Sequence, residues 1–135
     1  MTGIGILEME RNQSLTTQAG KVEILPTPDV FLRLADNSSL NMISPELANT
    51  EVQLDKGRAI VEVIDIREEN NIRINQKGAS TKLLKKGLYD FDVDHGEIRV
   101  FNGSAQVSAG NRKVTYIGPG PSSDWLGNKR LVERS

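Results

Sequence analysis

Three aspartates occupy alternate positions in one short stretch: Asp90, Asp92 and Asp94. Carboxylates at this spacing are typical of the start of a calcium-binding loop, where oxygen ligands alternate along the chain. An EF-hand loop needs glycine at its sixth position and glutamate at its twelfth, where this chain has histidine and phenylalanine. On a strand the three carboxylates would share one face, with Phe91 and Val93 on the other. The pattern therefore favours the solvated face of a half-buried strand over a calcium site.

Catalytic chemistry finds little support in the other polar residues. His95 is the single histidine and cysteine is absent, so a zinc site or a Ser-His-Asp triad lacks its usual members. We interpret His95 as a turn residue. No serine lies in a Gly-x-Ser-x-Gly motif, and Gly3-Ile4-Gly5 and Gly118-Pro119-Gly120 lack the rest of a phosphate-binding loop. Clustered carboxylates can act as acid and base, but no second catalytic group accompanies them. We predict no catalytic residue, no cofactor and no metal ligand.

Trp125 is the single tryptophan and lies in a polar C-terminal segment. It is either a packing residue against the sheet or an exposed anchor for a partner. Aromatic residues make up 4% of the chain, which is low for a carbohydrate-binding groove built from stacking platforms. Trp125 is therefore the one residue that we predict as a possible partner-binding position.

Acidic and basic residues nearly balance, with 17 lysines and arginines against 18 aspartates and glutamates interspersed along the chain. Nucleic-acid or anionic-membrane binding usually shows as a basic stripe, which is absent. No apolar run approaches the roughly 20 residues of a membrane-spanning helix, so we predict no membrane insertion by this chain. At 135 residues the chain suits one domain with its own core. The lack of cysteine excludes disulfides without deciding the compartment.

Short runs of alternating apolar residues, separated by turn glycines, predict an all-β fold. Ser44-Pro45-Glu46-Leu47 is the one helix signal, because an N-cap residue precedes proline at the first helical position. We expect a poorly ordered lead-in over residues 1–19, the all-β domain over 20–117 and a flexible tail over 118–135. The predicted core is the alternating apolar set: Val22, Ile24, Leu32, Leu34, Val52, Leu54, Val61, Val63, Ile72, Ile74, Phe91, Val93, Ile98, Val100 and Val107.

The pattern of Glu51–Val63 returns at Glu97–Ala109 with a constant offset of 46 residues, which is 97 minus 51. In both units apolar residues alternate on each side of a central glycine, Gly57 in the first and Gly103 in the second. We interpret Glu51–Val63 as a β-hairpin with its turn at Lys56-Gly57. A fixed offset favours a short-stranded β-solenoid-like stack of coils over a sandwich-like fold, and both alternatives stay open.

The order of these units resembles that of FecR-type domains. Gly57-Arg58-Ala59-Ile60-Val61 and Gly103-Ser104-Ala105-Gln106-Val107 each read Gly-x-Ala-x-Val. Ile72-Arg73-Ile74 and Gly87-Leu88-Tyr89-Asp90-Phe91-Asp92-Val93 follow between them, as the family's extended segments do. The resemblance covers residues 20–117 and rests on pattern and order. The family commonly has Gly-Thr where this chain has Gly87-Leu88.

The resemblance implies an all-β, solenoid-like extracytoplasmic module, periplasmic in bacteria. In the best understood members this domain relays the loaded state of an outer-membrane transporter across the inner membrane and controls a sigma factor. The sigma-binding segment and membrane helix of those members have no counterpart in this sequence, so sigma-factor regulation is not carried over. The lack of an export signal predicts that the chain is part of a longer protein.

We therefore predict a non-enzymatic FecR-like domain that acts in protein interaction or signal relay in the bacterial envelope. Its expected partner is a protein of the cell envelope, with no nucleic acid involved. The alternatives are a carbohydrate- or cell-wall-binding domain and a purely structural all-β domain. The sequence does not decide the binding face or the oligomeric state.

Overall fold

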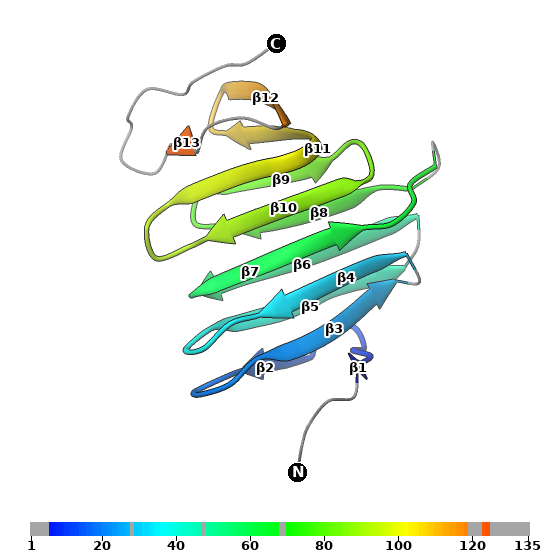
Figure 1. The fold of residues 1–135 in the computed structure, drawn as a ribbon, viewed down its shortest axis with the longest axis vertical. Coiled ribbons are helices and arrows are strands. Elements are labelled where there is room, and N and C mark those ends of the chain that lie inside the picture. Colours follow the sequence, from blue (N-terminus) through cyan, green and yellow to red (C-terminus); the bar gives the residue numbers. More distant parts are fainter. Residues whose placement is uncertain (1–5, 28, 47, 68–69, 119–122, 125–135) are drawn as a thin grey trace.

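The computed structural model describes residues 6–27, 29–46, 48–67, 70–118 and 123–124. Within these residues all regular secondary structure is β-strand (Figure 1). The strands are β1 (Ile6–Leu7), β2 (Ser14–Thr16), β3 (Val22–Thr27), β4 (Val30–Leu34), β5 (Ser39–Glu46), β6 (Asn49–Lys56), β7 (Arg58–Val63), β8 (Ile72–Gln76), β9 (Ala79–Leu83), β10 (Gly87–Asp92), β11 (Glu97–Ala109), β12 (Arg112–Gly118) and β13 (Ser123–Asp124). None of the described segments is a helix long and apolar enough to cross a membrane.

The strands form two sheets that lie face to face and share β11 (Figure 1). We call the first the front sheet: β1, β3, β4, β7, β10, the first half of β11 and β13. The second, the back sheet, contains β2, β5, β6, β8, β9, the second half of β11 and β12. The all-β prediction is confirmed, and the fold is sandwich-like.

Within each sheet the strands follow one another in chain order. The chain alternates between the sheets, usually placing an antiparallel pair in one before crossing to the other. Two stretches differ. β1, β2 and β3 form one coil, in which β3 returns beside β1 in parallel, and β6, β7 and β8 form another, in which β8 returns beside β6 in parallel. The second unit of the repeat, Glu97–Ala109, belongs to neither coil, so the 46-residue offset does not mark successive solenoid coils.

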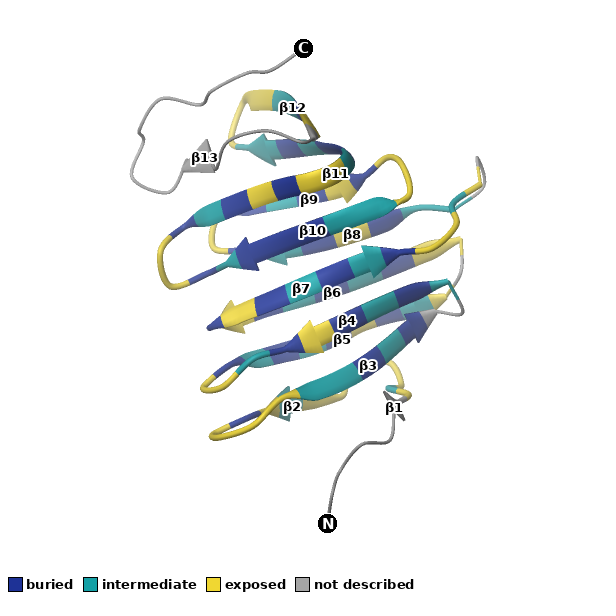
Figure 2. Cartoon of the chain, in the orientation of Figure 1, coloured by how far each residue is buried: buried dark blue, intermediate teal, exposed yellow. Residues whose placement is uncertain are grey.

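The core lies between the two sheets, because one face of each strand points inward (Figure 2). All the predicted core residues except Val22 are buried, and Val22 packs against the core from its margin. Each fully buried aliphatic side chain contributes about 1.5–3 kcal/mol. Residues outside that alternating set also contribute: Val30, Leu40, Met42, Ala59, Ala79, Leu83, Tyr89, Ala105 and Tyr116.

The predicted hairpin over Glu51–Val63 is wrong. β6 pairs with β5 and β8 in the back sheet, whereas β7 pairs with β4 and β10 in the front sheet. Gly57 is therefore the corner at which the chain crosses between sheets. The second unit crosses likewise, because β11 pairs with β10 up to Asn102, with β12 from Gly103 and with β9 from Ala105. Alternation around a glycine is the same in a hairpin and in a corner, so the pattern did not separate them.

The predicted helical turn at residues 44–47 is also wrong. Ser44, Pro45 and Glu46 belong to β5 and pair with β6, opposite Glu51, Thr50 and Asn49. A register irregularity between Met42 and Ser44 precedes the proline. Proline has no N–H to give a ladder and is tolerated in strands near such irregularities. Leu47 lies outside the described residues.

The stretch expected to be a poorly ordered lead-in contains paired residues. β1 runs parallel to β3 beside Glu23 and Ile24, and β2 pairs with β5. Thr17 is buried and donates its hydroxyl to the carbonyl of Ala35 at 2.6 Å. Of the predicted tail, Gly118 ends β12 and Ser123–Asp124 pairs with β11. Trp125 lies outside the described residues, so its role stays a prediction.

Candidate interaction surface

Charged side chains gather on the outer face of the front sheet, where β7, β10 and β11 lie side by side. The register places Arg58 beside Asp92 on β10, and Asp92 beside Glu97 on β11. Asp90 lies opposite Arg99 in the next outward row. A shallow hollow is lined by these five residues, which we call the front charged cluster. Their strand neighbours, such as Ala59 and Phe91, face the core, so strand alternation alone holds the charges outward.

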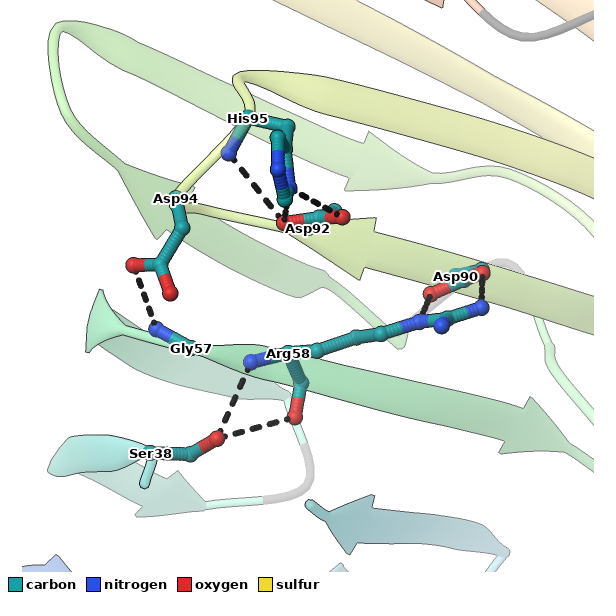
Figure 3. Close-up of polar contacts among 7 residues, drawn as sticks. All are labelled: Ser38, Gly57, Arg58, Asp90, Asp92, Asp94 and His95. Atoms are coloured by element: carbon teal, nitrogen blue, oxygen red, sulfur yellow. Dashed lines mark hydrogen bonds and ion pairs between the residues drawn. The ribbon is translucent and has the colours of Figure 1, made fainter. Parts of the chain in front are cut away.

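Arg58 and Asp90 form the central contact of the cluster (Figure 3). The Nε and Nη2 atoms of Arg58 donate to the two carboxylate oxygens of Asp90, at 2.9 and 2.5 Å. The Asp90 side chain is 3% exposed and the Arg58 side chain 48% exposed. The hydrogen bonds to Asp90 raise the pKa of Arg58 above its ordinary value, so the cation is retained. Two-point contacts between guanidinium and carboxylate are strong and fix both side chains.

Asp90 and Asp92 share the outer face of the front sheet, as the sequence predicted, but Asp90 is not solvated and Asp94 lies in the turn after β10. Asp90 is buried beneath Arg58, which reaches across from the neighbouring strand. Asp92 accepts from the main-chain N–H of His95 at 3.2 Å and lies 2.9 Å from its Nδ1. Asp94 accepts the main-chain N–H of Gly57 at 3.0 Å. Each of the three carboxylates thus makes a separate contact (Figure 3). In the described part of the chain, no three acidic or histidine residues are grouped so that they could hold a metal ion.

The corner at Gly57 positions Arg58. Ser38 is buried and its Oγ accepts the main-chain N–H of Arg58 at 3.0 Å. The same hydroxyl donates to the carbonyl of Asp36 at 2.9 Å. The carbonyl of Gly57 accepts the N–H of Val93 at 2.8 Å, which joins the corner to the end of β10. Arg58 therefore leaves a corner that is fixed on both sides, and its guanidinium is directed along β7 toward Asp90 (Figure 3).

A second set of ion pairs lies on the same face, nearer the N-terminal end of the sheet. Arg33 Nε is 2.9 Å from Glu23 and its Nη2 is 3.6 Å from Glu62. These side chains are between 38% and 44% exposed, so each pair contributes little to stability. Phe101, on β11, is 42% exposed. The front face therefore combines paired charges of both signs with apolar surface.

The outer face of the back sheet differs from the front face. Its central row reads Ser14, Asn41, Gln53, Asn75, Ser80 and Ser108, each beside the next on the adjacent strand. Ser80 donates to Asn75 at 2.8 Å, and Asn75 donates to Glu51 at 2.7 Å. An open groove follows this row around the β8–β9 turn. The row contains no aromatic side chain, which a stacking site for sugars would use.

Sequence reasoning missed the Arg58–Asp90 pair. The two residues are 32 positions apart, and nothing in the local pattern of either strand marks the other as a partner. The predicted hairpin also hid the contact, because it placed β7 beside β6 instead of β10. The position of Arg58 directly after the repeated glycine is a signal that becomes informative once Gly57 is known to be a corner.

Comparison with known proteins supports the architecture. The chain matches no protein-family model and no curated protein sequence. Its fold is similar to two crystal structures, at 2.50 and 1.65 Å resolution, of a protein from Parabacteroides distasonis ATCC 8503 described as a "putative anti-sigma factor". Both comparisons give a TM-score of 0.65 and 12% identity, and cover 82% of this chain and 57% of that chain. This chain therefore spans a little over half the length of the proteins it matches, and the likeness establishes the fold.

Proposed function

We propose that this chain is a non-enzymatic, FecR-like domain that acts in protein interaction or signal relay in the bacterial cell envelope. The observation that carries the proposal is the front charged cluster. In its central pair, the Asp90 side chain is buried, the Arg58 side chain is half-exposed, and two hydrogen bonds join them. A fixed arrangement of both signs of charge suits recognition of another protein, because complementary charges set the register and exclude wrong partners.

Two further observations support this proposal. The fold is similar over 82% of the chain to a protein whose description places it in sigma-factor regulation. The two Gly-x-Ala-x-Val units that resemble FecR-type domains lie at the two corners between the sheets. A bacterial regulatory module located outside the cytoplasm, with an envelope protein as its partner, agrees with both.

The front charged cluster also favours protein binding over catalysis. Arg58 and Asp90 are bonded to each other, and Asp92 accepts from His95. A general base or a nucleophile needs a lone pair that substrate can reach, and a general acid needs a proton that substrate can reach. The side-chain arrangement in this hollow therefore fits a binding surface.

The test is capture of a partner with matched variants. The tagged chain is incubated with bacterial envelope extract, cross-linked, and the retained proteins are identified and quantified. We expect an envelope protein to be retained in stoichiometric amount and to be lost with Glu97→Lys on the front face. The control is Lys82→Glu on the back sheet, where an exposed charge is reversed without touching the cluster.

Other outcomes would overturn the proposal. Retention that survives Glu97→Lys but fails with Lys82→Glu would move the binding face to the back sheet. Recovery of peptidoglycan or polysaccharide alone would support the carbohydrate-binding alternative. A chain that retains nothing at high loading would support a purely structural domain.

A further inference from the structure

β12 is the last strand of the back sheet and leaves one edge open. It pairs with β11 over its whole length of 7 residues, and no other strand in the described part of the chain pairs with it (Figure 1). An open edge presents unpaired backbone N–H and C=O groups, which are a template for another strand. Ile117 on this strand is 46% exposed.

The other sheet edges are short or covered. At the opposite end of the back sheet, β2 has 3 residues, and the main chain of Asn12 and Gln13 bonds to Met42 beside it. In the front sheet, β1 covers part of β3, and β13 covers the start of β11. β12 is therefore the longest uncovered edge among the described strands.

The direction of the backbone groups on β12 follows from a contact on the far side of β11. The N–H of Leu84 donates to the carbonyl of Ser104 at 2.8 Å, so the peptide groups of Ser104 face β9. Backbone groups alternate in an antiparallel ladder, so those of Ala105 face β12 and bond to Tyr116, its register partner. The peptide groups of Lys113, Thr115 and Ile117 consequently point to the open edge.

This edge is complementary to itself. Two copies of β12, antiparallel and centred on Thr115, would place Lys113 opposite Ile117 of the second copy. Thr115 would lie opposite Thr115 of the second copy, a favourable cross-strand pair. The residues whose peptide groups face outward then meet one another, so each pair can exchange two hydrogen bonds.

Charge and packing agree with this register. Arg112 and Lys113 lie at one end of β12, so in the antiparallel pair both meet neutral residues at the other end. The aliphatic stem of Lys113 would cover the exposed Ile117 of the second copy. On the core side, Val114 would lie beside Tyr116 of the second copy, extending the apolar layer across the junction.

We propose that two copies of this chain associate through β12 and form one continuous back sheet. The occupant of the edge is a second copy, because the register just described places no like charges opposite each other and covers the exposed apolar side chain. The pairing leaves the front charged cluster free, so it is independent of the proposed function.

Sedimentation of the full chain over a range of concentrations tests this pairing. The native chain is expected to shift from monomer to dimer as concentration rises. Thr115→Lys would place two like charges opposite each other at the centre and is expected to remain monomeric, as is Thr115→Glu. A mixture of the two variants is expected to recover the dimer, because the opposed charges then attract. A melting curve for each variant confirms that it is folded.

Thr16→Lys provides the matched control, because Thr16 is an exposed threonine on β2, the strand at the opposite end of the back sheet. It is expected to dimerise like the native chain. A native chain that stays monomeric at every concentration would overturn the proposal. So would dimerisation of Thr115→Lys at the native level, or a Lys–Glu mixture that remains monomeric.

Discussion

At the two corners, Gly57 and Gly103, the main chain is bonded by hydroxyl groups from different parts of the sequence. In each, the residue after the glycine donates its main-chain N–H at 3.0 Å to a hydroxyl, Ser38 at the first corner and Tyr89 at the second. The same hydroxyl approaches that residue's own carbonyl, at 3.4 and 3.1 Å. At both corners, therefore, a hydroxyl from another part of the chain contacts the N–H and the carbonyl of the residue that follows the glycine.

The corners differ in direction. At Gly57 the chain passes from the back sheet to the front sheet, and at Gly103 it passes from front to back. Both glycines have positive φ, 90° and 106°, which L-residues with a side chain rarely adopt. Whichever way the chain crosses, the corner therefore requires glycine, because φ is positive and atoms of another residue lie close to it.

Replacing either corner glycine should give the largest loss of stability. A Cβ on Gly57 would lie 2.6 Å from the Cα of Ser38, and one on Gly103 would lie 2.9 Å from Cζ of Tyr89. Gly57→Ala and Gly103→Ala are each expected to lower the free energy of unfolding by about 3 kcal/mol, since strain and overpacking add. Urea unfolding monitored by circular dichroism measures this loss.

Gly110→Ala separates the two causes. Gly110 also has positive φ, 62°, but a Cβ there would meet nothing within 4 Å. Only the backbone strain then applies, and the expected loss is about 1 kcal/mol. Equal losses at Gly110 and at the corners would show that close approach at the corners does not matter.

The ion pair beside the first corner should give the next largest effect. Arg58→Ala would leave the 3% exposed carboxylate of Asp90 without its cation and is expected to cost about 2 kcal/mol. Arg33→Ala on the same face removes ion pairs among half-exposed side chains and should cost less than about 1 kcal/mol. Similar losses for both variants in urea unfolding would contradict a special role for the pair at the corner.

Removing the two hydroxyls compares the corners directly. Tyr89→Phe and Ser38→Ala each leave a main-chain N–H without its partner, at a cost of about 1–2 kcal/mol. Tyr89 should give the larger loss, because the N–H that it bonds belongs to Ser104, which is 5% exposed, whereas the N–H that Ser38 bonds belongs to the exposed Arg58. A smaller loss for Tyr89→Phe than for Ser38→Ala would mean that water replaces the phenol at the second corner.

The smallest effect is expected in the pH dependence of the second corner. Burial raises the pKa of Tyr89 above its ordinary value. The unfolded chain therefore loses this proton first, at a pKa of about 10. The stability that this tyrosine provides is fully present below that pH, and is lost as pH rises toward the higher pKa of the folded state. Melting temperatures of the native chain and Tyr89→Phe should converge above pH 10, and parallel curves would contradict the mechanism.

Much of the fold could be predicted from the sequence because strand alternation is a local property. Ile24, Leu54 and Val100 were assigned to the core from period-two patterns alone, and they are buried. The central glycines of the repeat were recognised for the same reason. A hairpin and a corner have the same local pattern, however, so the sheet to which β6 and β7 belong required the structure.

The candidate site could be predicted only in part. Asp90, Asp92 and Asp94 were recognised as a group, but the partners of Asp90 and Asp94 come from the distant corner at Gly57, and that of Asp92 from the turn at His95. The partner of Asp90, Arg58, is 32 residues away, and that of Asp94 is the main chain of Gly57, 37 residues away. Such contacts depend on strand order, which single-sequence periodicity does not encode.

The order of strands in the sandwich bears on how the chain can assemble. From β3 onward, each strand pairs with at least one strand that precedes it in the sequence. A chain emerging from a ribosome or a translocation pore, N-terminus first, would find a docking site for each new strand already made. After β1 and β2, which pair with the later strands β3 and β5, no strand would have to wait with both edges unpaired. This topology is therefore suited to vectorial folding, in which the sandwich lengthens at one end as the chain arrives.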